Sequence, residues 1–422
     1  MAEDYSSDDD LEQPPEEKLP PPIPTGVELT AFDSYFRNSP YPTLADLRER
    51  DPVHHDMELN RYFLTRHADV AKVLDDEDLW CDPHKARPDS FSRSHAGFDL
   101  AQEPLLPLMD GPAHARLRGL VSAALSAEIL EAFRPRINTI VTKLLDELDE
   151  SEFEIELMHR YAARIPRLVI AELFGINPQQ RQQFTQWSDA FIAGCVNPNC
   201  SENEALAAAA ARTDLDALFS REIAARRGVP TGDLISAMLR AEHAGASLHD
   251  VEIIAQCRFL LAAGNITATD LIGNGIRAML QNTRQMTILR ERPELIGNAV
   301  EEVLRFDSPV VMVNRIANRD IVVGGCPIAR GETVSVSLAG ANRDESVYEL
   351  PDHFDIERAD THHHSFGGGR HVCLGARLAR MQAEEAILGM VVRFPEIELS
   401  PLGWEFAAFP GLRSLKHFWV RT

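Results

Sequence analysis

Cysteine is scarce in this sequence, and its spacing excludes two classes of protein. The 422 residues contain six cysteines, with no CxxC pair among them: Cys81, Cys195, Cys200, Cys257, Cys326 and Cys373. Disulfide-stabilised scaffolds carry cysteine at much higher density, and zinc sites need several ligands at close spacing. No apolar signal segment precedes these residues. We therefore expect reduced thiols and a cytoplasmic protein.

Long apolar runs and an excess of positive charge are also missing. No charge-free apolar stretch of roughly 18 to 20 residues occurs, so we expect no membrane span. The chain has 42 Lys and Arg against 65 Asp and Glu, a formal net charge of −23. Nucleic-acid-binding proteins present a basic face, so this balance argues against such a partner. With 44% hydrophobic residues, the chain can bury a large core.

The first residues differ in composition from the rest. Residues 1–24, MAEDYSSDDDLEQPPEEKLPPPIP, combine acidic residues and prolines with few side chains able to pack in a core. We predict a disordered or loosely attached arm here, most simply a solubilising tail. A single domain is expected over residues 25–422, and a monomer in solution.

The periodicity of the chain predicts a mainly helical α+β fold. Residues 53–74 alternate, turn at Asn60 and then become helical, which is typical of a hairpin packed beside a helix. Helical periodicity dominates from about 115 to 300, and short strands separated by glycines return at about 320–337. The regular βαβ alternation of dinucleotide-binding folds is absent. We expect a large helical body with a long central helix and small β-sheets set apart from it.

The long helix is expected to cross the whole domain. Ser247 and Asp250 have the spacing of a capping box, and the helical pattern runs to about Gln281. At 1.5 Å per residue the helix would be roughly 50 Å long.

The centre of this helix contains residues that a purely structural helix does not need. Gly264 costs about 1 kcal/mol relative to alanine at such a position. The hydroxyl of Thr267 can bond the carbonyl of Ala263 and leave a polar notch in an apolar wall. Close packing against another helix at the small residue is the alternative explanation of the glycine.

The stretch SFGGGRHVCLGARLAR, residues 365–380, places one cysteine after three glycines and before a helical pattern. A metal-binding cysteine binds as thiolate, which nearby amide groups and positive charge stabilise. Glycines 367–369 can adopt positive φ and turn amides toward the sulfur of Cys373, at the start of the predicted helix. No second cysteine or close histidine pair stands in metal-ligand spacing with Cys373, which disfavours zinc and iron–sulfur sites. Haem, whose macrocycle supplies the other ligands, fits best.

The same stretch resembles the haem-binding loop of the cytochrome P450 family. The pattern FxxGxHxCxG is matched by Phe366, Gly369, His371, Cys373 and Gly375. Further P450-like motifs occur in the family's order from about residue 27 to the end. The resemblance implies a P450-like fold, haem b as the cofactor and the thiolate of Cys373 as the ligand of its iron.

The resemblance also assigns residues around the haem. His114 and Arg118, in GPAHARLR, are similar to the HxxxR motif that binds the haem propionates, and cations facing carboxylates are electrostatically favourable. AAGNIT, residues 262–267, matches the oxygen-binding groove of the family and implies that Thr267 is catalytic together with Cys373. The expected haem contacts are His114, Arg118, Ala263, Gly264, Arg315, Phe366, Gly367, His371 and Cys373.

Glu302 and Arg305, in EEVLR, resemble the ExxR pair of the family. On a helix expected to begin near Pro293, they would form a buried ion pair that needs further hydrogen bonds to be tolerated. The family often completes this pair with an arginine, and we align His353, in PDHF, with that position. Because histidine can still donate a hydrogen bond, we predict a weaker version of the same pair.

Ile266 departs from the family pattern, in which an acidic residue usually precedes the threonine. Oxygen activation at haem consumes two protons, so the polar chain from Thr267 to solvent matters for efficiency. Asn265 or Asp270 can orient water, although Asp270 lies three residues from Thr267 and can point elsewhere. Groups on the substrate, or peroxide in place of dioxygen, are the alternatives.

The resemblance to soluble bacterial P450 enzymes implies partners. Their electrons come from a ferredoxin served by an NAD(P)H-dependent reductase. We expect Arg370, Arg377 and Arg380 to form a basic patch near Cys373 that steers an acidic ferredoxin, although each is explained equally well as a solvated helix residue.

The predicted substrate chamber is apolar. The stretch after the ExxR helix lines the pocket in the family, and it meets apolar residues of the long helix here. We expect a small to medium apolar substrate, such as an aromatic or terpenoid compound, with a polyketide or steroid not excluded. The predicted lining is Leu260, Ala263, Ile266, Val310, Val311, Met312 and Val313, closed by Phe191, Ile192 and either Phe91 or Phe98.

Three functions are compatible with these residues. The first is a monooxygenase that uses dioxygen and ferredoxin for hydroxylation or demethylation. The second, motivated by Ile266, is a haem-thiolate enzyme driven by peroxide or performing a coupling or dehydration. The third is a haem protein that binds or senses a ligand without turnover, which the retention of Gly264 and Thr267 disfavours.

Overall fold

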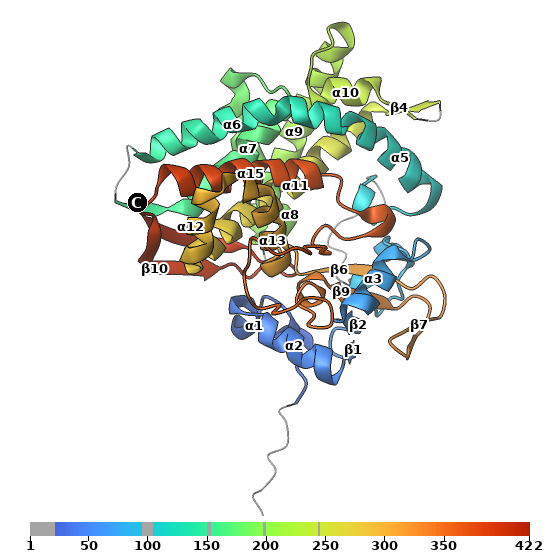
Figure 1. Ribbon diagram of the computed structural model, residues 1–422. Coiled ribbons are helices and arrows are strands. Elements are labelled where there is room, and N and C mark those ends of the chain that lie inside the picture. The colour runs from blue at the N-terminus through green and yellow to red at the C-terminus, as the bar shows by residue number, and fades with distance from the viewer. Residues whose placement is uncertain (1–21, 95–103, 150–152, 197–199, 244) are drawn as a thin grey trace, which may run out of the picture.

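The computed structural model describes residues 22–94, 104–149, 153–196, 200–243 and 245–422 (Figure 1). Helices make up most of it, in agreement with the predicted class. They are α1 Ser34–Asn38, α2 Tyr41–Arg50, α3 His67–Asp75, α4 Phe91–Ser94, α5 Gly111–Ala124, α6 Ala127–Asp149, α7 Arg164–Leu173, α8 Arg181–Val196, α9 Glu202–Gly228, α10 Leu234–Arg240, α11 Asp250–Gln281, α12 Thr283–Glu291, α13 Ile296–Phe306, α14 Leu338–Ala341 and α15 Ala376–Arg393.

The strands form small sheets, as the sequence predicts. A four-stranded sheet has the order β1-β2-β9-β6, a three-stranded sheet the order β10-β11-β3, and two hairpins are β4-β5 and β7-β8. Their bounds are β1 Val53–Asp56, β2 Arg61–Leu64, β3 Glu154–Glu156, β4 Glu242–His243, β5 Ala246–Ser247, β6 Met312–Ile316, β7 Ile321–Val323, β8 Cys326–Ile328, β9 Thr333–Ser337, β10 Glu398–Phe406 and β11 Leu415–Arg421.

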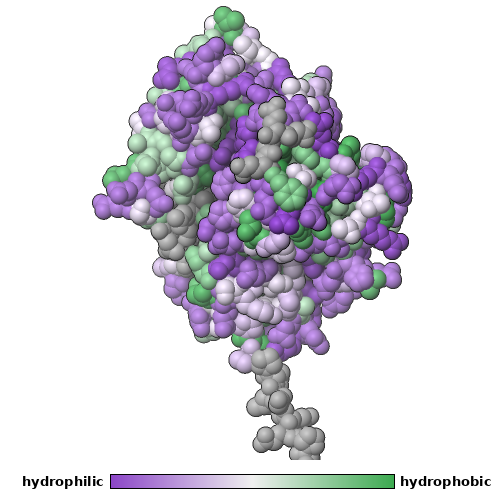
Figure 2. Space-filling model, turned by 90° about the vertical axis from the view of Figure 1, so that its left-hand side faces the viewer, coloured by the Kyte–Doolittle hydropathy of each residue, from purple (hydrophilic) through white to green (hydrophobic). Residues whose placement is uncertain are grey.

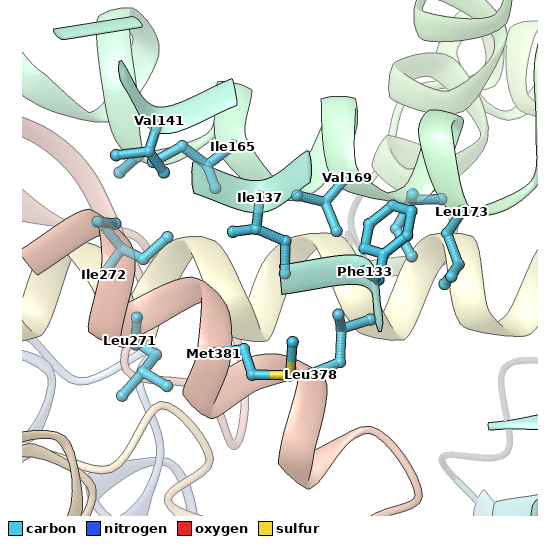
Figure 3. Packing of buried hydrophobic residues seen from close by; sticks show 14 of the residues in the cluster. Phe133, Ile137, Val141, Ile165, Val169, Leu173, Leu271, Ile272, Leu378 and Met381 are labelled. Carbon is cyan, nitrogen blue, oxygen red and sulfur yellow. The ribbon is translucent and has the colours of Figure 1, made fainter. Parts of the chain in front are cut away.

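The helical body is built on four helices that share one apolar core. Figure 3 shows side chains of α6, α7, α11 and α15 converging, and every one of them is buried. Burying such side chains contributes about 1.5–3 kcal/mol each relative to exposure, so this core is the main source of stability. Those labelled are Phe133, Ile137 and Val141 of α6, Ile165, Val169 and Leu173 of α7, Leu271 and Ile272 of α11, and Leu378 and Met381 of α15.

The predicted early hairpin shares a sheet with β9, the last of the strands predicted at about 320–337, whereas β7 and β8 of that region form a separate hairpin. β1 and β2 pair antiparallel around Asn60, whose φ is 50°, and α3 follows directly. β2 then pairs in parallel with β9, and β9 antiparallel with β6, so that residues from both ends of the chain meet. In Figure 1 this sheet and α1–α3 lie below the helical body.

The three-stranded sheet was not predicted. β11 pairs with β10 on one side and with β3 on the other, which brings the last strand of the chain beside residues 154–156. β3 has three residues, too few to show a period of two, and β10 has a register shift between Leu399 and Trp404 that hides its alternation.

The long central helix is confirmed, with one correction at its start. α11 ends at Gln281 as predicted, but it begins at Asp250 and its cap is His249, whose amide donates to Glu252 Oε2 at 2.9 Å. Ser247 lies in β5 and does not cap the helix. By length and composition, α11 is the one candidate membrane span among the described residues. In the fold it packs against α7, α13 and α15 at the centre of the body.

The predicted arm falls almost wholly outside the described residues, which begin at residue 22. The division into an arm and a single domain therefore stays a prediction.

Candidate haem-thiolate site

The loop before Cys373 is tightly folded. Gly367 and Gly369 have φ of 70° and 59°, whereas Gly368 is extended, so two of the three glycines adopt the predicted positive φ. A Cβ on Gly369 would stand 2.4 Å from the carbonyl oxygen of Leu74, at the end of α3. The amide of Cys373 donates to the carbonyl of Phe366 at 2.9 Å. Glycine is thus required by conformation and by contact with α3.

Cys373 directly precedes the start of α15 and is an exposed residue, although protein atoms surround its sulfur. Burial by the surrounding protein raises its pKa, while the amides of Gly375 and Ala376 and the charges of Arg118 and Arg380 act in the opposite direction. These amides belong to the helix start. The raised pKa favours the thiol in the protein alone, and a metal cation bound to the sulfur would favour the thiolate. This is the condition of a metal ligand.

The four predicted propionate partners come from three elements. His114 and Arg118 lie on α5, His371 lies in the loop before Cys373, and Arg315 lies on β6. The rings of His114 and His371 are 4.2 Å apart between centroids, at 30°. Arg118 donates to the carbonyl of Val372 at 2.6 Å, and Arg315 is buried on β6. Arg315 also acts on His371, so the cluster is electrostatically coupled.

The histidines of this cluster have ring nitrogens without a hydrogen-bond partner. Within the described ranges, Nε2 of His114 and both ring nitrogens of His371 are buried with no hydrogen-bond partner. Burial, followed by the nearby charges of His114, Arg315 and Arg370, lowers the pKa of His371 to about 3. Buried polar groups are normally hydrogen-bonded, so a carboxylate-bearing group fits this cluster. Two haem propionates supply such a group.

The notch on α11 forms as predicted. Thr267 Oγ1 donates to the carbonyl of Ala263 at 2.7 Å, and Asn265 Nδ2 donates to the carbonyl of Leu261 at 2.9 Å. A Cβ on Gly264 would lie 3.4 Å from Ile170 of α7, which is an ordinary contact. Packing against α7 therefore does not by itself require glycine at position 264. Close helix packing, the alternative explanation of this glycine, is not supported by this contact.

Asp270 does not belong to the notch. Its carboxyl lies in the core, where Oδ1 accepts a hydrogen bond from Ser414 at 2.8 Å, on the side of β11. Burial raises the pKa of this carboxyl well above its usual range. It therefore takes no part in a relay through Thr267.

Part of the predicted substrate lining is accessible. Leu260 and Ile266 are partly exposed on α11, although residues 270–280 of the same helix are buried throughout. Val310 and Val313 are also partly exposed. An apolar surface left open on a central helix is where an apolar ligand would bind.

Other lining predictions are wrong or lie outside the description. Val311 is buried in a separate cluster with Leu29 and Phe36, beneath α1 and α2, whereas Val310 and Val313 pack against the cluster of the four-stranded sheet. Phe91 packs under the guanidinium of Arg61, 4.8 Å from the ring centroid, and does not close a pocket. Phe98 lies outside the described residues. Phe191 and Ile192 are half-buried on α8.

The ExxR pair is present and fully buried. Arg305 donates to both carboxylate oxygens of Glu302, at 2.7 and 2.8 Å, and both side chains have zero exposure. Its remaining donors reach the carbonyls of Asn342, Pro351 and His353 at 2.9–3.1 Å. The further hydrogen bonds required of a buried ion pair are therefore in place.

The third member of this group is Arg358, and the assignment of His353 is wrong. Arg358 Nε donates to Glu302 Oε2 at 3.2 Å, and Nη2 donates to the carbonyl of His353 at 3.0 Å. His353 contributes its backbone, and its ring is exposed. The sequence does contain this arginine, four residues after Phe354 in HFDIER, but the motif PDHF led to His353 instead.

The three arginines predicted as a basic patch all have acidic partners. Arg377 donates to Glu131 at 2.9 Å, Arg380 to Glu301 at 2.6 Å, and Arg370 to the carbonyl of Leu79 with Asp110 at 3.4 Å. Their charge is largely compensated, so the prediction of a net basic patch is not supported by this geometry.

A cysteine just before a helix, a cluster of two arginines and two histidines with unpartnered ring nitrogens, and a notched central helix together fit a haem-thiolate site. The comparisons place it further. Residues 276–402 match the family model described as Cytochrome P450. The chain is 34% identical over 387 residues to "Putative cytochrome P450 YjiB" of Bacillus subtilis, covering 89% of this chain and 93% of that protein. It is 35% identical to the "Vitamin D(3) 25-hydroxylase" of Pseudonocardia autotrophica, covering 89% and 92%.

Solved structures agree. The crystal structure of CYP109E1 from Bacillus megaterium in complex with corticosterone has a TM-score of 0.82 and 30% identity, covering 92% of this chain and 99% of that one. The chain belongs to the cytochrome P450 family. It is an oxidoreductase of the monooxygenase type with haem as its cofactor.

Proposed function

We propose that this P450 inserts one oxygen atom of dioxygen into a small to medium apolar substrate, by hydroxylation or demethylation. The second oxygen atom leaves as water, at the cost of two electrons and two protons. A ferredoxin with its NAD(P)H-dependent reductase supplies the electrons, and the enzyme acts as a cytoplasmic monomer. The open apolar surface of α11 beside the Thr267 notch is the observation that carries this proposal.

The residues divide the work. Bound haem supplies the oxidising chemistry of the family. Cys373 would hold its iron, and His114, Arg118, Arg315 and His371 would hold its propionates, which satisfies the buried nitrogens described above. Thr267 offers a hydroxyl at the notch that can donate and accept a hydrogen bond, and so pass a proton.

The substrate class rests on the apolar lining and on relatives. Leu260, Ile266, Val310 and Val313 offer aliphatic surface, which favours a ligand recognised by shape and apolar area. Relatives are named for vitamin D(3) 25-hydroxylation and polyketide biosynthesis, and a related structure contains corticosterone. We therefore place terpenoids, steroids and polyketide-like molecules first among the candidates.

A second function is a peroxide-driven enzyme. Ile266 cannot carry a proton, and Asp270 faces Ser414 instead of Thr267. Peroxide already contains the electrons and protons that the dioxygen route must deliver, so a weak relay matters less in that case.

The deciding experiment compares product formation with an NADPH–reductase–ferredoxin system and with hydrogen peroxide, on the same apolar substrate. The proposal predicts faster turnover with the redox partners. Faster turnover with peroxide, with little gain from the partners, would establish the second function. A spectral shift on substrate binding with no product under either condition would identify a ligand-binding protein.

A further inference from the structure

Away from the haem-binding loop, one group of side chains has the composition of a transition-metal site. Glu156, His159 and His417 bring a carboxylate oxygen and two imidazole nitrogens within 4.8 Å of one another. We propose that these residues bind a divalent cation, Zn²⁺ or Cu²⁺. The cation fastens the last strand of the chain to the segment that leads into α7.

The strand pairing places two of the ligands together. Glu156, the last residue of β3, lies opposite Trp419 of β11. His417 comes two residues before Trp419, and residues two apart on a strand point to the same face. The side chains of Glu156 and His417 are therefore diagonal neighbours on one face of the sheet.

The third ligand comes from the turn that follows β3. A π-helical segment, Met158–Ala162, begins two residues after Glu156 and carries His159 back over the strand. His159 Nδ1 lies 2.6 Å from Glu156 Oε2, and the centroids of the His159 and His417 rings are 5.7 Å apart. The three side chains thus converge from two segments that are distant in the sequence.

The carboxylate is held in place before any cation binds. Oε2 of Glu156 accepts a hydrogen bond from the amide of His159 at 2.7 Å, and Oε1 accepts one from the amide of Phe418 at 2.9 Å. Nδ1 of His417 lies 3.9 Å from Oε1. Each carboxylate oxygen faces one imidazole, so small side-chain rotations bring all three donors to one cation. Such fixing of a ligand by outer hydrogen bonds is usual at metal sites.

The donor set selects the kind of cation. Two imidazoles and one carboxylate suit Zn²⁺, Cu²⁺ and Ni²⁺, whereas Mg²⁺ and Ca²⁺ prefer oxygen alone. Among these cations Cu²⁺ binds most tightly to a given site. The side chains of His159 and His417 are 65% and 42% exposed, which leaves an entry path and room for water as a further ligand.

The surroundings are compatible with a hydrated cation. Glu405 lies opposite His417 in the β10–β11 register and adds negative charge, part of which is compensated by Lys416 at 3.1 Å. The side of the molecule that carries β10 and the C-terminus in Figure 1 faces the viewer in Figure 2 and is mostly hydrophilic. The site is therefore accessible to ions from solution.

A cation bound by both segments would bind the folded chain more tightly than the unfolded one, and so stabilise it. The cation would connect β11 to the π-helical segment Met158–Ala162. The buried residues Met158 and Tyr161 of that segment belong to the main core. The proposed function uses none of the three ligand residues. The outcome of the cation test is therefore independent of the outcome for the proposed function.

The test uses the full-length haem-loaded protein, treated with a chelator that removes metal ions other than the haem iron. Zn²⁺ binding is measured by titration calorimetry, and Cu²⁺ ligation by electron paramagnetic resonance, after subtraction of the spectrum of the same haem-loaded protein without copper. The variants are His159→Asn, His417→Asn and the double variant. His55→Asn, an exposed histidine of β1 stacked on Tyr62, is the matched control.

We expect one saturable equivalent of Zn²⁺ and a Cu²⁺ spectrum with two nitrogen ligands. Affinity falls at least tenfold in each single variant and is lost in the double variant, with His55→Asn unchanged. Should a histidine variant lose its haem spectrum, Glu156→Gln serves in its place with the same expectation. Binding that survives in the double variant, or that moves only on replacing His362–His364, would overturn the proposal, as would the absence of saturable binding.

Discussion

Replacing Arg358 tests the reassignment of the buried ion-pair group. Arg358 is 12% exposed at its side chain and donates to Glu302, to the carbonyls of Glu349 and Leu350, and to that of His353. Hydrogen bonds to charged groups contribute about 1.5–3 kcal/mol each, while water replaces part of the carbonyl bonds in the variant. Arg358→Ala should therefore lower the free energy of unfolding by about 2–3 kcal/mol.

Two further variants provide reference values for the free energy of unfolding. His353→Ala should change the free energy of unfolding by less than about 0.5 kcal/mol, because the exposed ring is removed and its backbone carbonyl stays. Arg305→Ala should cost about 3–5 kcal/mol, since it leaves the carboxylate of Glu302 buried with its main partner gone.

The assay is guanidinium unfolding of the haem-loaded protein, followed by tryptophan fluorescence and by loss of the haem absorbance. Arg358→Lys is a second test, because lysine keeps the charge and loses the planar fork of donors. A cost of His353→Ala equal to that of Arg358→Ala would refute the reasoning, and would return the histidine to the role first predicted for it.

Three further outcomes follow from the geometry. Thr267→Ala should reduce the fraction of NADPH electrons recovered in product severalfold, with substrate binding retained; unchanged coupling would remove Thr267 from the relay. Asp270→Asn should leave that coupling within about twofold, because the buried side chain bonds to Ser414 and not to Thr267; a large loss would return Asp270 to the relay. Burial holds the pKa of His364 at about 4, below its usual 6.5, so stability should be complete above pH 6.5 and fall between pH 6.5 and about 4. Unfolding measured against pH should show a smaller fall in His364→Asn.

Much of the fold could be predicted because strong local signals agreed with the global structure. Asn60, the glycines near 324 and 331, and the apolar period of α11 each specify their element with few competing options. The three-stranded sheet could not be predicted, because β3 and β11 meet only through long-range pairing and neither shows a clean alternation. Sequence period carries no information about which distant strand a short segment joins.

The candidate residues of the haem site could be selected from the sequence for a chemical reason. A thiolate ligand, cationic propionate partners and a notched helix each restrict residue type strongly, so Cys373, His371 and Thr267 stood out. Arg358 and Val311 were missed or misplaced because their roles depend on geometry. The chain turns between His353 and Arg358, and only the second side chain reaches Glu302. Val311 packs in a cluster built by residues distant in the sequence, among them Leu29 and Phe36, which no local pattern indicates.

The central claim is that Cys373 is the thiolate ligand of a haem iron in this protein. It is tested most directly by the carbon monoxide difference spectrum of the dithionite-reduced protein, recorded for the native chain and for Cys373→Ser. Thiolate ligation by Cys373 predicts a strongly red-shifted Soret band in the native protein that is lost in the variant. An absence of haem, or a band at the position typical of histidine ligation that the variant retains, would contradict it.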